Sequence, residues 1–116
     1  MSSTGSSTKP LEISVKATHQ MLVEGAEFCF VDCRTPGESA TASIASATLI
    51  PMETLADRLG DLPEDKGHHI VVHCHHGGRS LRVTHWLRQQ GYLNCQSMAG
   101  GIDAWSDQID PTVPKY

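Results

Sequence analysis

The segment over residues 70–80 joins a short apolar run to a cysteine, two glycines and an arginine. Because β-branched residues dominate its first part, residues 69–73 predict a buried strand, and the pattern over 80–90 predicts a helix. The glycine pair 77–78 permits the tight backbone that must join these two elements. A loop that closes onto a helix N-terminus directs several N–H groups at one point, where an anionic sulfur would be stabilised. Cys74 is therefore the candidate nucleophile.

Strand-like and helix-like patterns alternate along the rest of the chain. Further short strands are expected over 10–13, 28–32, 47–50 and 95–98. Further helices are expected over 15–24, over 52–59, which carries an amphipathic stripe, and over 102–105. Residues 32–37 contain the proline and glycine of a loop. Strands that alternate with helices predict an α/β domain with a mostly parallel sheet and helices on both faces, and ligands bind beyond the carboxyl ends of such strands, where Cys74 lies.

The length of 116 residues suits a single domain. The polar residues 1–9 predict a disordered N-terminal tail, residues 10–109 the folded domain and residues 110–116 a C-terminal tail. The formal net charge of −4, without a basic stripe, disfavours binding to nucleic acid or to a membrane surface. Apolar runs of only a few residues are too short to span a membrane. Because no secretory signal is visible, we expect a cytoplasmic protein with reduced cysteines.

Three motifs, in order, resemble those of a single-domain rhodanese, a thiosulfate sulfurtransferase. Residues 30–38 (FVDCRTPGE) are similar to the early strand of that family with its Asp-x-Arg…Glu signature. Residues 74–80 (CHHGGRS) are similar to its active-site loop, and residues 98–105 (MAGGIDAW) to its closing Gly-Gly…Trp motif. The tail over 110–116 (DPTVPKY) resembles the end of the rhodanese domains of E1-like adenylating enzymes in thiamine and molybdopterin synthesis.

The resemblance implies a five-stranded parallel sheet and a cysteine that cycles through a persulfide. Cys74 would take a sulfane sulfur from thiosulfate or a persulfide donor and pass it to a thiophilic acceptor, such as cyanide, a small thiol or a protein cysteine. Arg79 would shape the loop and support its charge, and Ser80 would hydrogen-bond the sulfur or cap the helix. The rest of the substrate-binding loop would be His75, His76, Gly77 and Gly78. The implied chemistry requires no cofactor and no metal.

His75 and His76 occupy positions where many sulfurtransferases carry Arg or Lys. Histidine is only partly protonated near neutral pH, so the loop attracts a dianionic donor less strongly. This departure disfavours thiosulfate and favours a protein or persulfide donor.

Asp32 and Arg34 allow two interpretations. In the first, Arg34 supplies positive charge at the mouth of the cleft and Asp32 organises the loops. In the second, the two residues form a structural ion pair at the end of a strand. Cys33, which lies between them, is either a resolving thiol or an idle one.

Two other functions compete with sulfur transfer. The first alternative is a non-catalytic rhodanese-like module that binds a protein. The second is a cysteine phosphatase or arsenate reductase, whose loop places five residues between the cysteine and the arginine; here only four intervene, and the pocket should be narrower. A zinc site at the histidines is disfavoured because consecutive side chains are expected to diverge and because no other paired Cys/His spacing completes four ligands.

Overall fold

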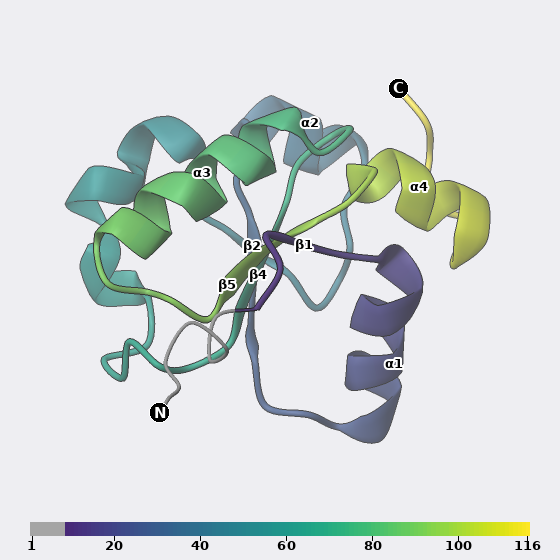
Figure 1. The fold of residues 1–116 in the computed structure, drawn as a ribbon. Coiled ribbons are helices and arrows are strands. Elements are labelled where there is room, and N and C mark those ends of the chain that lie inside the picture. Colours follow the sequence, from purple (N-terminus) through teal and green to yellow (C-terminus); the bar gives the residue numbers. More distant parts are fainter. Residues whose placement is uncertain (1–8) are drawn as a thin grey trace.

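The computed structural model describes residues 9–116, so the tail expected over 1–9 lies outside the described residues except for Lys9. A five-stranded sheet has the order β1-β5-β4-β2-β3, and each neighbouring pair is parallel (Figure 1). Its strands are β1 (Glu12–Ile13), β2 (Cys29–Asp32), β3 (Thr48–Leu49), β4 (Ile70–His73) and β5 (Cys95–Met98). The prediction of an α/β domain with a parallel sheet is confirmed.

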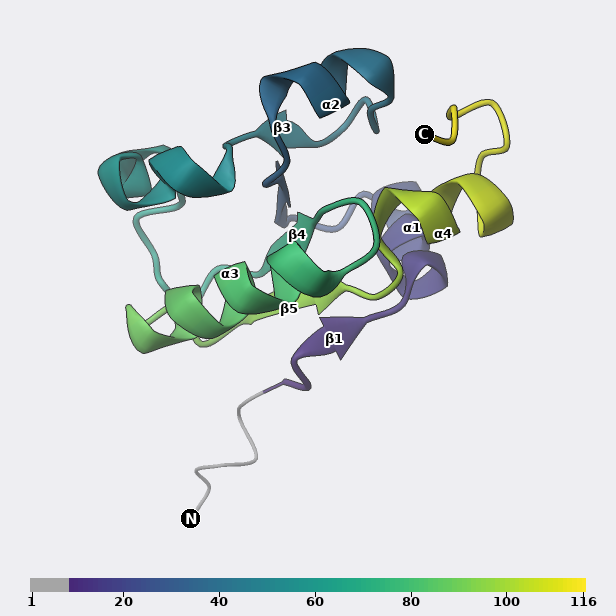
Figure 2. The ribbon, with the colours of Figure 1, turned by 90° about the horizontal axis from the view of Figure 1, so that it is seen from above.

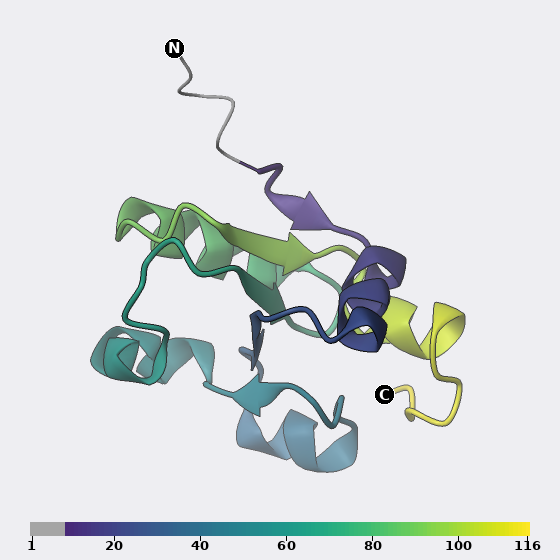
Figure 3. The same ribbon diagram turned by 90° about the horizontal axis from the view of Figure 1, so that it is seen from below.

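Helices lie on both faces of this sheet. The α-helices are α1 (Val15–Glu24), α2 (Pro36–Thr41), α3 (Gly78–Gln89) and α4 (Gly101–Gln108), and two 3-10 helices are η2 (Met52–Asp57) and η3 (Leu59–Asp61). Helices α1 and α4 pack on each other over one face, whereas α3, η2 and η3 cover the other (Figures 2 and 3). Alternate residues of β4 supply both cores: Ile70 and Val72 face α3, and Val71 faces α4.

Local capping explains the limits of α1. The Ser14 side chain accepts a hydrogen bond from the backbone N–H of Ala17 at 3.0 Å, which satisfies one of the first amides of the helix. Gly25 ends the helix in a left-handed conformation (φ 71°). The helix expected over 15–24 is confirmed with these limits.

Helix α2 begins where a loop was expected over 32–37. Thr35 caps it, Pro36 occupies its first turn, and Thr35 and Glu38 form a reciprocal capping box. The sequence Thr-Pro-Gly-Glu carries that capping signal. The prediction that Pro36 and Gly37 belong to a loop was therefore wrong, because both residues lie in the first turn of α2.

The helix expected over 52–59 is divided into η2 and η3. The break lies at Arg58 (φ −118°, ψ 24°), and the backbone N–H of Arg58 donates to the carbonyl of Leu55 in a 3-10 pattern. An apolar spacing of three residues fits one turn of either helix type, so the stripe alone does not distinguish them. Leu55 is buried against the core as the stripe predicts.

The segment over 110–116 returns toward the sheet after α4. Val113 is buried, and the Ser106 hydroxyl donates to its carbonyl at 2.7 Å. Lys115 forms ion pairs with Asp103 at 3.2 Å and with Asp107 at 2.7 Å. These contacts bring the end of the chain close to the carboxyl ends of β2 and β4. Among residues 9–116, no helix is long and apolar enough to cross a membrane.

Candidate active site

Cys74 follows β4 directly, and its side chain is buried at the centre of the loop that leads into α3. The backbone N–H of Gly77 donates to its Sγ at 3.1 Å, and that of Ser80 donates at 3.3 Å. The Ser80 hydroxyl oxygen lies 3.3 Å from the same sulfur. Two amides at the start of a helix, together with the helix dipole, stabilise negative charge on this sulfur. The prediction that the loop amides point at Cys74 is confirmed by these distances.

Ser80 is held by a second serine that the motifs do not include. Its hydroxyl lies 2.7 Å from that of Ser97 on β5 and donates to the carbonyl of Gly77 at 3.2 Å. Ser97 is fully buried, and its register partner on β4 is Val72. The only sequence signal for this contact was that Ser97 lies within the strand expected over 95–98.

The glycines of the closing motif press against the Cys74 loop. A Cβ on Gly101, whose φ is +61°, would lie 2.5 Å from the carbonyl oxygens of both Cys74 and His75. The backbone N–H of Ile102 donates to the first of these carbonyls at 2.9 Å, and that of Asp103 donates to the second at 3.1 Å. The N-terminus of α4 therefore fixes the loop backbone, and only glycine fits at this close approach.

Arg34 and Asp32 form a buried ion pair. The guanidinium donates from Nε to Oδ1 at 2.8 Å and from Nη2 to Oδ2 at 2.7 Å, and the Arg34 side chain has no exposed surface. Nη2 also donates to the carbonyl of Ala42 at 2.7 Å. Of the two interpretations of Asp32 and Arg34, the structural ion pair at the end of a strand is therefore the arrangement observed, and the buried Arg34 presents no charge at the mouth of a cleft.

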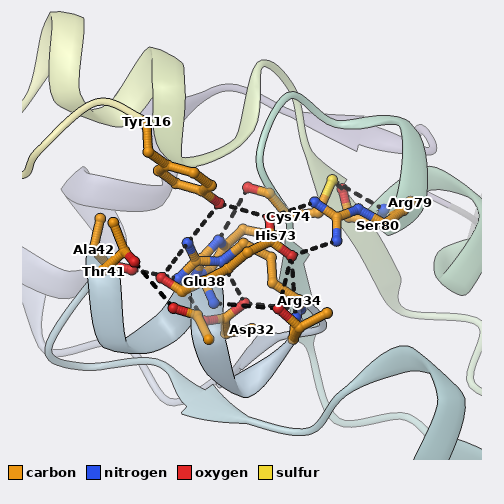
Figure 4. A network of polar contacts seen from close by, with 12 residues as sticks. Asp32, Arg34, Glu38, Thr41, Ala42, His73, Cys74, Arg79, Ser80 and Tyr116 are labelled. Carbon is orange, nitrogen blue, oxygen red and sulfur yellow. Dashed lines mark hydrogen bonds and ion pairs between the residues drawn. The ribbon is translucent and has the colours of Figure 1, made fainter.

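Arg79 pairs with Glu38 rather than with the sulfur. Its Nη1 and Nη2 donate to the two carboxylate oxygens of Glu38 at 2.7 and 2.9 Å. The adjacent guanidinium holds the pKa of Glu38 well below its usual range, and the same contact raises the pKa of Arg79. Figure 4 shows this bidentate pair between the Cys74 loop and the Asp32–Arg34 pair. Glu38 is therefore part of the site, although the sequence analysis did not include it among the site residues.

Tyr116 is a further member that sequence reasoning missed. Its hydroxyl accepts from Nη1 of Arg34 at 2.8 Å and donates to Oε2 of Glu38 at 2.9 Å. Its ring stacks on His75 with centroids 3.9 Å apart and an interplanar angle of 7°. No local pattern signals a contact across 82 residues.

His75 and His76 lie side by side instead of diverging. Their rings stack at 3.8 Å, so the reason given against a metal site was wrong for this pair. With Asp103 they form the group of three ligand atoms within 4.8 Å that the described residues offer to a metal ion. The Asp103 carboxylate already accepts from Lys115 at 3.2 Å. Partial burial lowers the pKa of His75, which favours a neutral ring at pH 7.

Cys33 lies next to the candidate nucleophile, Cys74, at the end of the neighbouring strand. Asp32 and His73 are register partners on β2 and β4, and each is followed directly by one of the two cysteines. Both cysteines belong to the core beneath α3. Burial, reinforced by the negative charge of a Cys74 thiolate, raises the pKa of Cys33 to about 12. Cys33 therefore remains a thiol near neutral pH, which disfavours a resolving role.

The fold and the site together define the class of protein. The central strand of a parallel sheet leads into a loop whose amides surround a cysteine. Residues 14–108 match the family model described as a rhodanese-like domain, and the chain belongs to that family. It is 35% identical over 102 residues to a protein of Allochromatium vinosum named sulfurtransferase, covering 88% of this chain and 94% of that protein. The expected five-stranded rhodanese fold is confirmed, and the named relative supports a sulfurtransferase family.

Two further comparisons place the chain among its relatives. A Staphylococcus aureus rhodanese-like domain protein superposes with a TM-score of 0.77 at 29% identity, covering 92% of this chain and 99% of that one. A Zea mays protein named "Adenylyltransferase and sulfurtransferase MOCS3-2" is 28% identical over 90% of this chain, which spans only 23% of the maize protein. The predicted similarity to rhodanese domains of adenylating enzymes is confirmed by this relative.

Proposed function

We propose that the protein is a sulfurtransferase that carries a sulfane sulfur as a persulfide on Cys74. The observation that carries the proposal is the position of the sulfur, which accepts from the amides of Gly77 and Ser80 at 3.1 and 3.3 Å. These donors stabilise a thiolate before the reaction, and they are placed to stabilise the negative charge of a persulfide after it. Arg79, which is paired with Glu38, is proposed to shape the loop without contacting the sulfur.

The reaction proceeds in two substitutions at sulfur. In the first, the Cys74 thiolate attacks the outer sulfur of thiosulfate, an S–S bond forms, and sulfite leaves with the electron pair of the broken S–S bond. With a persulfide donor, the donor's inner thiolate leaves instead. In the second, an acceptor thiolate or cyanide attacks the outer sulfur of the Cys74 persulfide, and the Cys74 thiolate is regenerated. Neither step needs an external oxidant or reductant.

The charges around Cys74 favour a persulfide donor over thiosulfate. Arg34 is neutralised by Asp32, and Arg79 is neutralised by Glu38. The lowered pKa of His75 leaves this ring mostly neutral near pH 7. A dianion therefore gains little attraction at the site, whereas a protein or small-molecule persulfide does not depend on it. We propose a protein thiol as one acceptor, and a reducing compartment such as the cytoplasm suits a free catalytic thiol.

The test is the intact mass of the protein after incubation with thiosulfate or a small persulfide. A gain of about 32 Da, one sulfur atom, that maps to Cys74 and disappears after addition of a thiol is the expected result. The Cys74→Ser variant should show no gain. The Cys33→Ser variant is the matched control, because it removes the neighbouring thiol, and it should gain sulfur like the wild type. A wild type that gains no sulfur from either donor contradicts the proposal and favours a binding module.

A further inference from the structure

The contacts of Tyr116 connect the C-terminal tail to the edge of the Cys74 site. Five residues take part, and we call them the rim cluster: Arg34, Glu38, His75, Arg79 and Tyr116. Four different parts of the fold supply them, namely the end of β2, helix α2, the Cys74 loop with the first turn of α3, and the tail. Figure 4 shows Tyr116 above Arg34 and Glu38, on the side of the network that carries the tail.

Tyr116 binds the Nη1 side of the Arg34 guanidinium. Nη1 also donates to the carbonyl of Glu38 at 3.4 Å, and Nη2 donates to the carbonyl of Ala42. Asp32 takes Nε and Nη2 of the guanidinium, and the Tyr116 hydroxyl accepts from Nη1 at 2.8 Å. The ring lies across the same group, with its centroid 5.7 Å from Cζ. Tyr116 itself is 40% exposed, whereas Arg34 is not exposed at all. The tyrosine thus separates this guanidinium from solvent.

The ring also covers the histidine that follows the nucleophile. It is nearly parallel to the His75 imidazole at 3.9 Å, and its hydroxyl donates to the carboxylate that binds Arg79. The tail that carries it is anchored independently by Val113 and Lys115.

We propose that Tyr116 determines donor specificity by covering Arg34, so that the rim of the Cys74 site offers no free arginine to a small dianion. This inference rests on the proposed sulfur transfer, because it concerns which donor reaches Cys74. With Tyr116 in place, thiosulfate meets a neutral aromatic surface and two arginines that are already paired. Without it, Nη1 of Arg34 becomes available to an anionic oxygen.

Thiosulfate binding to variants that lack the nucleophile tests the inference without any need for turnover. In a Cys74→Ser background, isothermal titration calorimetry should show tighter thiosulfate binding after Tyr116→Ala than in the parent. The freed Nη1 of Arg34 and an oxygen of thiosulfate would form an exposed charge pair, which corresponds to a decrease of up to about fivefold in the dissociation constant. Tyr116→Phe keeps the ring over Arg34 and should lie between the parent and Tyr116→Ala. Leu93→Ala, which removes an exposed side chain from the turn that precedes β5, is the control and should bind no more tightly than the parent.

Kinetics with Cys74 intact give a second readout. Tyr116→Ala should lower the KM for thiosulfate by more than it changes the KM for a cysteine persulfide, whereas a general loosening of the fold would affect both donors alike. Thiosulfate affinity that is unchanged or weaker after Tyr116→Ala overturns the role of Tyr116. Absence of a Cys74 persulfide in the wild type would instead overturn the proposed function, and the binding experiment would still decide the role of Tyr116.

Discussion

Replacing Gly101 with alanine should damage the protein through one identifiable contact. The new Cβ would lie 2.5 Å from the carbonyl oxygens of Cys74 and His75, and ordinary contact begins at 3.4 Å, so the chains must separate by about 0.9 Å. Such a shift disrupts the bonds from Ile102 and Asp103 to these carbonyls, each worth about 1 kcal/mol net. The left-handed backbone at φ +61° adds about 1–2 kcal/mol for any residue with a Cβ.

We therefore expect Gly101→Ala to lower the free energy of unfolding by about 3–4 kcal/mol, measured by urea denaturation. Gly25→Ala is the matched control, because its φ is +71° and nothing lies within 4 Å of the new Cβ. It should lose only the backbone contribution of about 1–2 kcal/mol. Equal losses in the two variants would refute the reasoning, since backbone strain alone would then account for both. Persulfide formation should also slow in Gly101→Ala and stay unchanged in Gly25→Ala.

Two further changes test the neighbours of Cys74. Glu38→Gln should lower the free energy of unfolding by about 1 kcal/mol at pH 6. Because Arg79 depresses the folded-state pKa of Glu38, that stabilisation is fully present above the ordinary value of 4.5. It declines as the pH falls below 4.5 and is lost only when the pH passes the depressed folded-state pKa, so the difference between wild type and variant in urea denaturation should shrink steadily below pH 4.5. A difference that does not shrink between pH 4.5 and pH 3 would contradict this, and Asp61→Asn, which removes an exposed pair with Arg58, serves as the control. Ser80→Ala should slow persulfide formation about tenfold, measured by intact mass at timed intervals, while the fold persists, because the hydroxyl that lies 3.3 Å from Sγ and donates to the carbonyl of Gly77 no longer holds the loop in place. An unchanged rate would show that this hydroxyl has no part in the reaction.

The strand–loop–helix unit around Cys74 follows from local chemistry. The apolar β-branched run of β4 needs burial on both faces, and the glycines permit the turn that aims two amides at the sulfur. Helix α2 was also encoded locally, by the capping box of Thr35 and Glu38, but the adjacent proline and glycine favour a loop equally well at the sequence level. In the η2 segment, apolar residues three positions apart fit both an α-helix and a 3-10 helix, so the sequence does not distinguish the two.

The sequence by itself determined the alternation of strands and helices, the parallel sheet and the loop that holds the candidate nucleophile, because each depends on residues adjacent in the chain. Only the tertiary structure decided what surrounds that nucleophile. Ser97, Glu38 and Tyr116 reach the site through crossovers and a returning tail, and their partners lie 17, 41 and 82 residues away. Arg34 is buried for the same reason, since its partners include Tyr116 from the tail as well as its near neighbour Asp32. The pattern of side chains along the chain determines local backbone conformation. The charge near Cys74 depends instead on which residues pair with the arginines, and residues far apart in the sequence form some of those pairs.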